Sequence, residues 1–202
     1  MGRIFYLMGK SAAGKDTMYR ELLDRYPMKT LVLYTTRPMR SGEVEGKTYY
    51  YTDKEGFLAL QRQGKVIEYR AYHTVHGEWI YATVDDGSID LTGDADYLLI
   101  GTLESYLKVR AYFGPGHVWP IYLQVDDGIR LQRALDRERS MARPRYAEMC
   151  RRFLADEEDF SEEKIREAGI SRRFDNVDKA ACLKEICSYI RVNGNMPEEE
   201  VL

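Results

Sequence analysis

Two spaced glycines and a lysine lie between a short apolar segment and a segment with a helical pattern. Residues 3–8 are mostly apolar, a GxxxxGK pattern follows them, and helical spacing of apolar residues begins at Lys15. In this context the glycines let backbone N–H groups curl around phosphate oxygens, and the helix N-terminus adds positive potential. The pattern therefore predicts a P-loop that binds the phosphates of ATP, made of Gly9, Lys10, Ser11, Ala12, Ala13, Gly14, Lys15, Asp16 and Thr17.

Two side chains of the P-loop have predicted chemical roles. Lys15 would reach the β- and γ-phosphates and so serve catalysis. Asp16 stands where P-loops usually carry a Ser or Thr whose hydroxyl binds Mg²⁺. A carboxylate is also a hard oxygen ligand, so Asp16 is a candidate ligand for Mg²⁺, the cofactor that accompanies ATP. A role in favouring the first turn of the helix is the alternative.

A second group of anion-binding side chains follows the second predicted strand, residues 30–34. The polar segment 35–49 places Arg37 and Arg40 close to two glycines and to Tyr49. Guanidinium groups present planar pairs of donors to one phosphate, and a phenol adds a neutral donor. We therefore predict that this acceptor loop binds the phosphate of a second ligand; a solvated loop with incidental arginines is the alternative.

The acceptor loop has the sequence TTRPMRSGEVEGKTY and resembles that of the guanylate kinase family, which has the form TTRxxRxGExxGxxY. The resemblance covers most of the chain, is strongest in the two loops and is weak over residues 85–145. It implies a P-loop nucleoside-monophosphate kinase, a phosphotransferase that converts GMP or dGMP to the diphosphate with ATP. It also implies that Arg37, Arg40 and Tyr49 hold the phosphate of GMP.

The resemblance extends to residues that would recognise the base. It implies that Glu68 accepts hydrogen bonds from guanine N1–H and the exocyclic amine, that Thr83 contacts the base and that Tyr81 joins the phosphate set. The family then has two aspartates separated by one residue, and this chain has Ile100 and Thr102 in their places. Thr102 could still contact the base, but the loss of carboxylates is expected to loosen the selectivity for guanine.

Arginines between two predicted helices resemble the lid of the family. We expect Arg137, Arg139 and Arg152 to neutralise charge on the phosphoryl group in transit, while other arginines nearby are solvated. Asn176 follows the last predicted strand and resembles the residue that contacts the adenine of ATP; a plain turn residue is the alternative. The predicted mechanism is alignment and charge neutralisation, without a covalent intermediate.

The order of predicted elements indicates how these side chains could meet. Strands alternate with helices, which predicts an α/β fold: a P-loop kinase with a parallel β-sheet core flanked by helices, plus an inserted acceptor-binding subdomain and a lid. We expect a single domain over 1–202, with the core at about 1–36 and 91–192, the insert at about 37–90, the lid at about 137–150 and a frayed tail at 193–202. One long charged helix is predicted over residues 146–168.

Composition limits the location and the partners of the chain. The 202 residues carry a net charge of -3 and are 44% hydrophobic, which favours a packed core and argues against nucleic-acid binding. No apolar run approaches the roughly 20 residues of a membrane span. The three cysteines lack a CxxC pair and fit a reducing cytoplasm. We therefore expect a cytoplasmic protein whose partners are ATP and a small phosphorylated acceptor; a monomer and a homodimer are both open.

Two other functions are also open. P-loop kinases similar to guanylate kinase act on ribose bisphosphate or on a different nucleotide, and they share the Gly-Lys-Asp sequence found at residues 14–16. Non-catalytic guanylate-kinase-like modules bind phosphopeptides, but they tend to lose the P-loop lysine, which this chain retains as Lys15. The intact acceptor loop and Glu68 favour GMP among these ligands.

Overall fold

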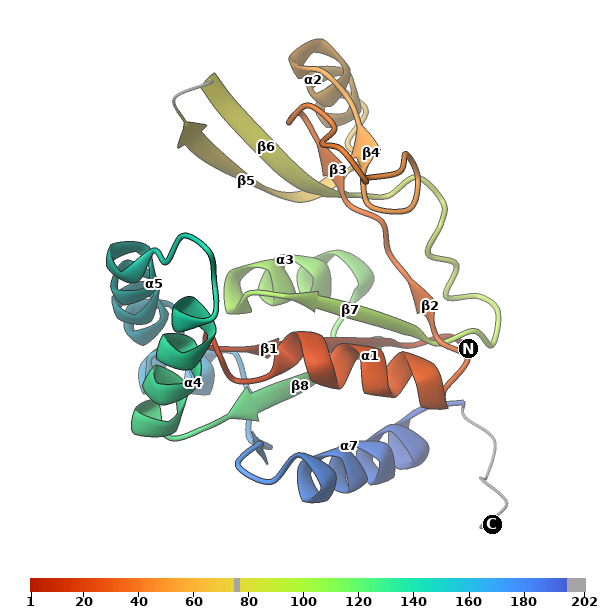
Figure 1. Ribbon diagram of the computed structural model, residues 1–202. Helices are drawn as coiled ribbons and strands as arrows, with labels where there is room; N and C mark the ends of the chain where they lie inside the picture. The colour runs from red at the N-terminus through yellow and green to blue at the C-terminus, as the bar shows by residue number, and fades with distance from the viewer. Residues whose placement is uncertain (75–76, 196–202) are drawn as a thin grey trace.

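The computed structural model describes residues 1–74 and 77–195 and contains two β-sheets. The larger one, the central sheet, is made of β1 (Ile4–Gly9), β2 (Lys29–Thr30), β7 (Tyr97–Gly101), β8 (Val118–Gln124) and β9 (Phe174–Asp175). Its order is β2-β7-β1-β8-β9, and every neighbouring pair is parallel. The predicted α/β fold with a parallel core is therefore confirmed (Figure 1).

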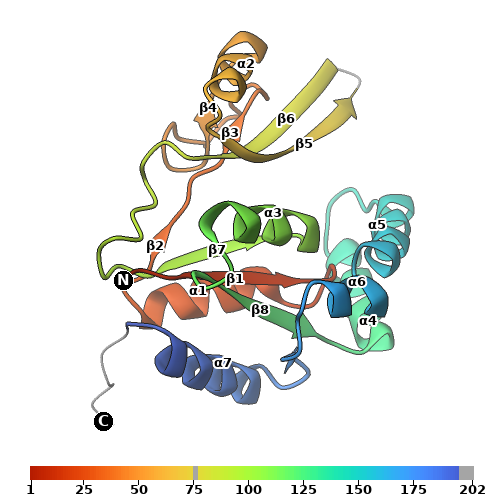
Figure 2. The same cartoon turned by 180° about the vertical axis from the view of Figure 1, so that it is seen from behind.

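The two faces of the central sheet are covered by different helices, as Figures 1 and 2 show. Side chains alternate across a strand, so Phe5 and Leu7 pack with α1 (Lys15–Arg25) and α7 (Lys179–Asn193). Tyr6 and Met8 face the other way and pack with α3 (Leu103–Phe113) and α6 (Glu162–Glu167). β1 is buried along its whole length, which explains its nearly continuous apolar sequence.

A second sheet, the small sheet, is formed by β3 (Tyr34–Thr35), β4 (Tyr50–Tyr51), β5 (Val66–Thr74) and β6 (Gly77–Val84), in the order β4-β3-β6-β5. One face packs on α2 (Lys54–Arg62) through Phe57, Ile80 and Val84. On its other side β5 packs against α3, which lies between the two sheets (Figure 2). The small sheet therefore stands over the central sheet and presents its β5–β6 ladder toward it.

Helices α4 (Asp127–Arg139) and α5 (Tyr146–Asp159) lie at the edge of the central sheet where β1 and β8 end (Figure 1). Asp126 caps α4 by accepting hydrogen bonds from the backbone N–H groups of residues 128 and 129. The single helix predicted over residues 146–168 is wrong: the structure has α5 and then α6. Phe160 is buried and stacks on Tyr122, and Ser161 caps α6, so packing and capping together end the first helix.

The N-terminus and residue 195 lie close together. The Asn195 backbone N–H donates to Asp96 at 2.7 Å, and its side-chain amide donates to the Met1 carbonyl at 2.7 Å. Residues 196–202, which belong to the tail predicted to fray, lie outside the described part of the chain. No helix in the described part is long and apolar enough to cross a membrane.

Candidate functional site

The P-loop closes between the end of β1 and the first turn of α1. Gly14 has a left-handed φ of 90° and is the N-cap of α1, with no side-chain hydrogen bond to the helix. The N–H groups of this helix end are therefore available to an anion. Lys15 Nζ donates to the carbonyl oxygens of Gly9 at 2.7 Å and Lys10 at 3.1 Å, so its side chain folds back across the loop. Burial lowers the pKa of this lysine.

Asn176 supports the P-loop from the end of β9. Its Nδ2 donates to the Ala13 carbonyl at 2.7 Å, and a Cβ at Gly14 would come within 2.5 Å of the same nitrogen. Asn176 Oδ1 is buried without a hydrogen-bond partner in the described residues. The side chain thus fixes the shape of the loop, a role that the sequence did not indicate; its predicted contact with adenine stays a prediction.

Asp16 lies in the first turn of α1, beside Lys15, with an exposed side chain. Its carboxylate makes no hydrogen bond or ion pair within the described residues, although its backbone carbonyl accepts from Arg20. A free hard oxygen at this place suits Mg²⁺ that arrives on nucleotide phosphates and keeps several waters. The described residues contain no group of three or more acidic, histidine or cysteine side chains that could hold an ion unaided.

A buried arginine that the sequence analysis missed ties the P-loop to α4 and α5. Arg130 is 1% exposed, donates to Asp127 at 2.6 Å and to Glu157 at 2.8 Å, and donates to the Ser11 carbonyl at 3.2 Å. Its guanidinium also lies 4.6 Å from the Phe153 ring centroid. One side chain therefore joins three segments that are distant in sequence.

Carboxylates of α5 contact the P-loop directly. Asp156 accepts a hydrogen bond from the Ser11 backbone N–H at 2.8 Å, and Glu157 pairs with Lys10 Nζ at 2.7 Å. We define the Arg130 cluster as Lys10, Arg130, Asp127, Asp156 and Glu157. The only sequence signal for it is the spacing of Asp127 and Arg130, which places them on one face of a helix; the long-range partners leave no local pattern.

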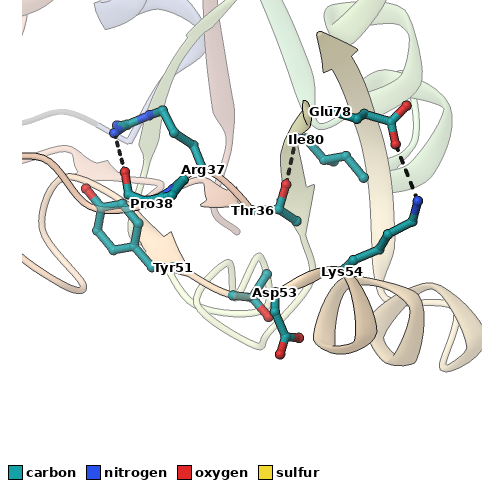
Figure 3. Close-up of a pocket in the computed structure, with 9 residues that line it drawn as sticks. Thr36, Arg37, Pro38, Tyr51, Asp53, Lys54, Glu78 and Ile80 are labelled. Carbon is teal, nitrogen blue, oxygen red and sulfur yellow. Dashed lines mark hydrogen bonds and ion pairs between the residues drawn. The ribbon is translucent and has the colours of Figure 1, made fainter. Parts of the chain in front are cut away.

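In the acceptor loop, Arg37 is buried and each of its three guanidinium nitrogens donates a hydrogen bond. Nε donates to the Tyr81 hydroxyl at 3.1 Å, and the two terminal nitrogens donate to Glu43 at 2.6 and 3.0 Å and to the Pro38 carbonyl at 2.7 Å. Figure 3 shows the bond to Pro38 beside a hollow that is separately bridged by Lys54 and Glu78. The hydrogen bonds from Arg37 lower the pKa of Glu43 to about 2.

Arg40 differs from Arg37, since its guanidinium is exposed and makes no hydrogen bond within the described residues. It lies 5.9 Å from the Trp79 ring centroid on β6. Tyr49 and Tyr81 meet edge to face with centroids 5.6 Å apart. Arg40, Tyr49 and Tyr81 therefore border one region, with Arg37 held behind it as the support of Tyr81.

The residues predicted to recognise a base meet in part. Thr83 donates to Glu68 Oε1 at 2.7 Å, and both side chains are buried. Thr102 is the N-cap of α3, and its hydroxyl forms a capping box with Ser105. Ile100 is the second-last residue of β7, two positions before Thr102. Glu68 and Thr83 thus form a pair, whereas the Thr102 hydroxyl is already used by the helix.

The predicted lid arginines occupy different places. Arg137 and Arg152 line a cavity of about 320 Å³ between α4 and α5. Arg152 also donates to Glu148 at 2.8 Å. Arg139 is exposed, and its nearest acidic group is Asp136 at 3.9 Å. The structure therefore brings Arg137 and Arg152 together and leaves Arg139 outside that cavity.

One cleft of about 740 Å³ joins most of these parts. It opens between the P-loop, the β5–β6 face, the end of β7 and α5. The lining residues are Ser11, Leu33, Tyr49, Arg70, Tyr72, Trp79, Tyr81, Ile100, Thr102, Glu148, Arg151, Arg152, Ala155, Asp156 and Asp159. Of the predicted site residues, Ser11, Tyr49, Tyr81, Thr102 and Arg152 therefore face this space, whereas Lys15, Arg37, Arg40 and Glu68 are not among its lining residues.

Comparisons with known proteins agree with one another. A family model described as guanylate kinase matches residues 1–86. A guanylate kinase of Aliivibrio fischeri is 36% identical over 103 residues, which are 48% of this chain and 49% of that protein. One from Bradyrhizobium diazoefficiens is 44% identical over 69 residues, 34% of this chain and 32% of that protein. The matches thus span about a third to a half of these relatives.

The shape agrees over a longer stretch than the sequence. The crystal structure of guanylate kinase from Anaplasma phagocytophilum superimposes with a TM-score of 0.60, covering 96% of this chain and 86% of that one, at 23% identity. At this identity the match concerns the fold alone. The family model matches the segment that holds the P-loop, the acceptor loop and the β5–β6 ladder. On these findings, residues 1–86 match the guanylate kinase family model, and the chain as a whole has the fold of a solved guanylate kinase.

Proposed function

We propose that this chain phosphorylates GMP or dGMP to the diphosphate with ATP. The observation that carries the proposal is the single cleft that P-loop, acceptor-loop and α5 residues line together. Transfer of a phosphoryl group needs donor and acceptor phosphates in line, with cations around the group that moves. The relatives named guanylate kinase supply the identity of the acceptor.

The chain's own groups would divide the work in the following way. The P-loop amides and Lys15 bind the β- and γ-phosphates of ATP, and Asp16 would hold the Mg²⁺ that accompanies them and neutralises their charge. Arg40, Tyr49 and Tyr81 bind the acceptor phosphate, with Arg37 fixing Tyr81 from behind. The acceptor oxygen belongs to a phosphate that is ionised near neutral pH, so no strong general base is needed.

The α4–α5 segment would act as the lid. Arg137 and Arg152 lie on its inner side, and Arg152 also borders the cleft. Closure would bring these cations onto the phosphoryl group and exclude water. Arg139, which lies outside the α4–α5 cavity, would join only if the last turn of α4 rearranges on closure.

A second candidate is a P-loop kinase for another phosphorylated acceptor, such as ribose bisphosphate or a different nucleotide. The observation in its favour is the end of β7, where Ile100 and Thr102 stand in place of the two family aspartates. Fewer carboxylates leave fewer groups that accept hydrogen bonds from guanine. This candidate keeps the P-loop and arginine roles unchanged.

One assay separates these candidates. The purified protein is incubated with ATP and Mg²⁺ and, separately, with GMP, dGMP, AMP, ribose 5-phosphate and ribose 1,5-bisphosphate, and the products are identified by chromatography. We expect diphosphate to form from GMP and dGMP. Transfer to a sugar phosphate alone would establish the second candidate. Thermal shifts with the same ligands, without ATP, report acceptor binding independently of turnover.

A further inference from the structure

The cleft-facing side of β5 carries two opposite charges, two residues apart. Glu68 and Arg70 lie on the same face of the strand because side chains alternate with a period of two. In the β5–β6 ladder Glu68 stands opposite Thr83, and Arg70 stands opposite Tyr81. Arg70 therefore lies between the carboxylate predicted to recognise a base and the tyrosine predicted to bind a phosphate.

Glu68 already uses one of its two oxygens. Oε1 accepts from the Thr83 hydroxyl at 2.7 Å, while Oε2 lies 3.6 Å from Arg70 Nε, beyond hydrogen-bond distance. Glu68 is buried, and its Oε2 is ion-paired with Arg70 without accepting a hydrogen bond from it. Oε2 is thus open to a donor such as a ring N–H or an amine.

Arg70 makes no hydrogen bond within the described residues, and its Nε is buried without a partner. This contrasts with Arg37, each of whose guanidinium nitrogens donates a hydrogen bond. Arg70 lines the 740 Å³ cleft and also the adjoining cavity of about 750 Å³ between β5, α3 and α6. A guanidinium in this position has donors to offer to an oxygen or nitrogen acceptor in the cleft.

The chemistry of guanine matches this pair. Its edge carries donors at N1 and the 2-amino group, beside acceptors at O6 and N7. A carboxylate suits the donors, and arginine is the side chain that most often pairs with O6 and N7. Adenine has an amine at position 6, which a guanidinium disfavours. The pair could therefore restore the selectivity that the absent aspartates would have supplied.

We propose that Arg70 is a specificity-determining residue that donates to guanine O6 or N7 while Glu68 Oε2 accepts from N1–H and the 2-amino group. The proposal rests on GMP being the acceptor. Thr102 also lines the cleft, but its hydroxyl is already used in the α3 cap. Arg70 has donors available there instead.

The test compares substrates within one enzyme preparation, so that incomplete folding of a variant cancels. The acceptors are GMP, 6-thio-GMP, whose sulfur is a weak acceptor, 7-deaza-GMP, which lacks N7, and IMP, which lacks the 2-amino group. The enzymes are the wild type, Arg70→Ala, Arg70→Lys and Glu68→Gln. Arg62→Ala, which removes an exposed arginine of α2 in the same subdomain, is the matched control.

We expect Arg70→Ala to lower kcat/KM for GMP roughly tenfold or more. The wild-type preference for GMP over 6-thio-GMP or 7-deaza-GMP should nearly disappear in this variant, while the ratio of GMP to IMP stays constant. Glu68→Gln should leave the preference for GMP over 6-thio-GMP and 7-deaza-GMP in place and lower the ratio of GMP to IMP. Arg70→Lys, which keeps the charge beside Glu68, should retain part of the preference, and Arg62→Ala should change none of these ratios.

Two results are distinguishable failures. If Arg70→Ala lowers kcat/KM for GMP, 6-thio-GMP and 7-deaza-GMP by one common factor, or leaves GMP turnover unchanged, Arg70 does not recognise the base and this inference is overturned. If the wild type turns over none of the purine monophosphates, the proposed function itself fails, and the role assigned to Arg70 fails with it.

Discussion

The two ends of the cleft hold their cations in different ways. At the P-loop end, Lys10 and Arg130 pair with carboxylates of α4 and α5, and Lys15 bonds to carbonyls of its own loop. At the acceptor end, each guanidinium nitrogen of Arg37 donates a hydrogen bond, whereas within the described residues Arg40 and Arg70 make no side-chain hydrogen bond, and Arg70 has an ion pair with Glu68 at 3.6 Å. A cation whose nitrogens already donate hydrogen bonds shapes a site, and one whose nitrogens do not is available to a ligand.

This comparison separates stability from function. We call a cation saturated when its nitrogens already donate hydrogen bonds to protein groups, and free when they do not. Removing a saturated cation should destabilise the fold, because carboxylates lose a partner. Removing a free cation should change ligand affinity and leave stability nearly unaltered. Lys15 is an exception: it has hydrogen-bond partners, but they are backbone carbonyls that water can replace, so its removal should cost little stability.

The largest effect is expected from Lys15→Ala. A preorganised donor to developing charge contributes about 2.7–4 kcal/mol, so turnover should fall roughly 100-fold or more. The melting temperature should stay close to that of the wild type, because Lys15 packs in no apolar cluster. A coupled assay of ADP formation measures the first quantity and calorimetry the second. Wild-type turnover in this variant would show that the P-loop assignment is wrong.

Arg130→Met tests the saturated class at the P-loop end. Methionine can still pack on Phe153, but Asp127 and Glu157 lose one of their two cationic partners and keep only Lys10, so the free energy of unfolding should fall by about 2 kcal/mol or more. KM for ATP should also rise, because Arg130 supports Ser11. Urea unfolding and initial rates provide the measurements.

Adding Glu157→Gln to Arg130→Met should recover part of the lost stability, since it reduces the excess of carboxylates over cations that is left around Lys10. Arg166→Met, at an exposed position of α6, is the matched control. Equal stability of Arg130→Met and the control would refute a structural role for the Arg130 cluster.

Arg40→Ala tests the free class at the acceptor end. Loss of a charge-assisted bond to phosphate should raise KM for GMP roughly tenfold, with KM for ATP and the melting temperature unchanged. Arg37→Ala should lower the melting temperature as well, because Glu43 and Tyr81 lose their partner. If the two variants behave alike in both measurements, the distinction between saturated and free arginines does not hold.

The smallest effect concerns the backbone of the P-loop. Ala12 has a φ of 61°, a conformation that glycine adopts without strain. Ala12→Gly should therefore raise the free energy of unfolding by about 0.5–1 kcal/mol, after the entropy that glycine adds to the unfolded chain is subtracted. Ala13→Gly next to it, where φ is not positive, should destabilise instead. Denaturant titrations of both variants provide the comparison.

The sequence predicted what is local and missed what is distant. The P-loop and the acceptor loop are contiguous patterns, and the alternation of strands and helices was enough for the parallel core. The break between α5 and α6 was missed because it depends on the stacking of Phe160 on Tyr122, a tertiary contact. Periodicity of charged residues continues across Ser161 and conceals the cap.

The same limit applies to the candidate site. In the sequence, Arg130 looks like any charged residue on the solvent side of a helix. Only the fold places Ser11 and Glu157 beside it. Asn176 was singled out for a ligand contact, but its hydrogen bond to Ala13 is visible only in three dimensions. Arg37 and Arg40 looked equivalent in sequence, and Glu43 makes them different.

The central claim is that one cleft holds both nucleotides, with the P-loop at one end and the acceptor loop at the other. A direct test is a calorimetric titration with adenosine and guanosine joined through five phosphates. We predict one molecule bound per chain, displaced by ATP and also by GMP, with weaker binding in both Lys15→Ala and Arg40→Ala. Binding that only ATP displaces, or that Arg40→Ala leaves unchanged, would contradict the claim.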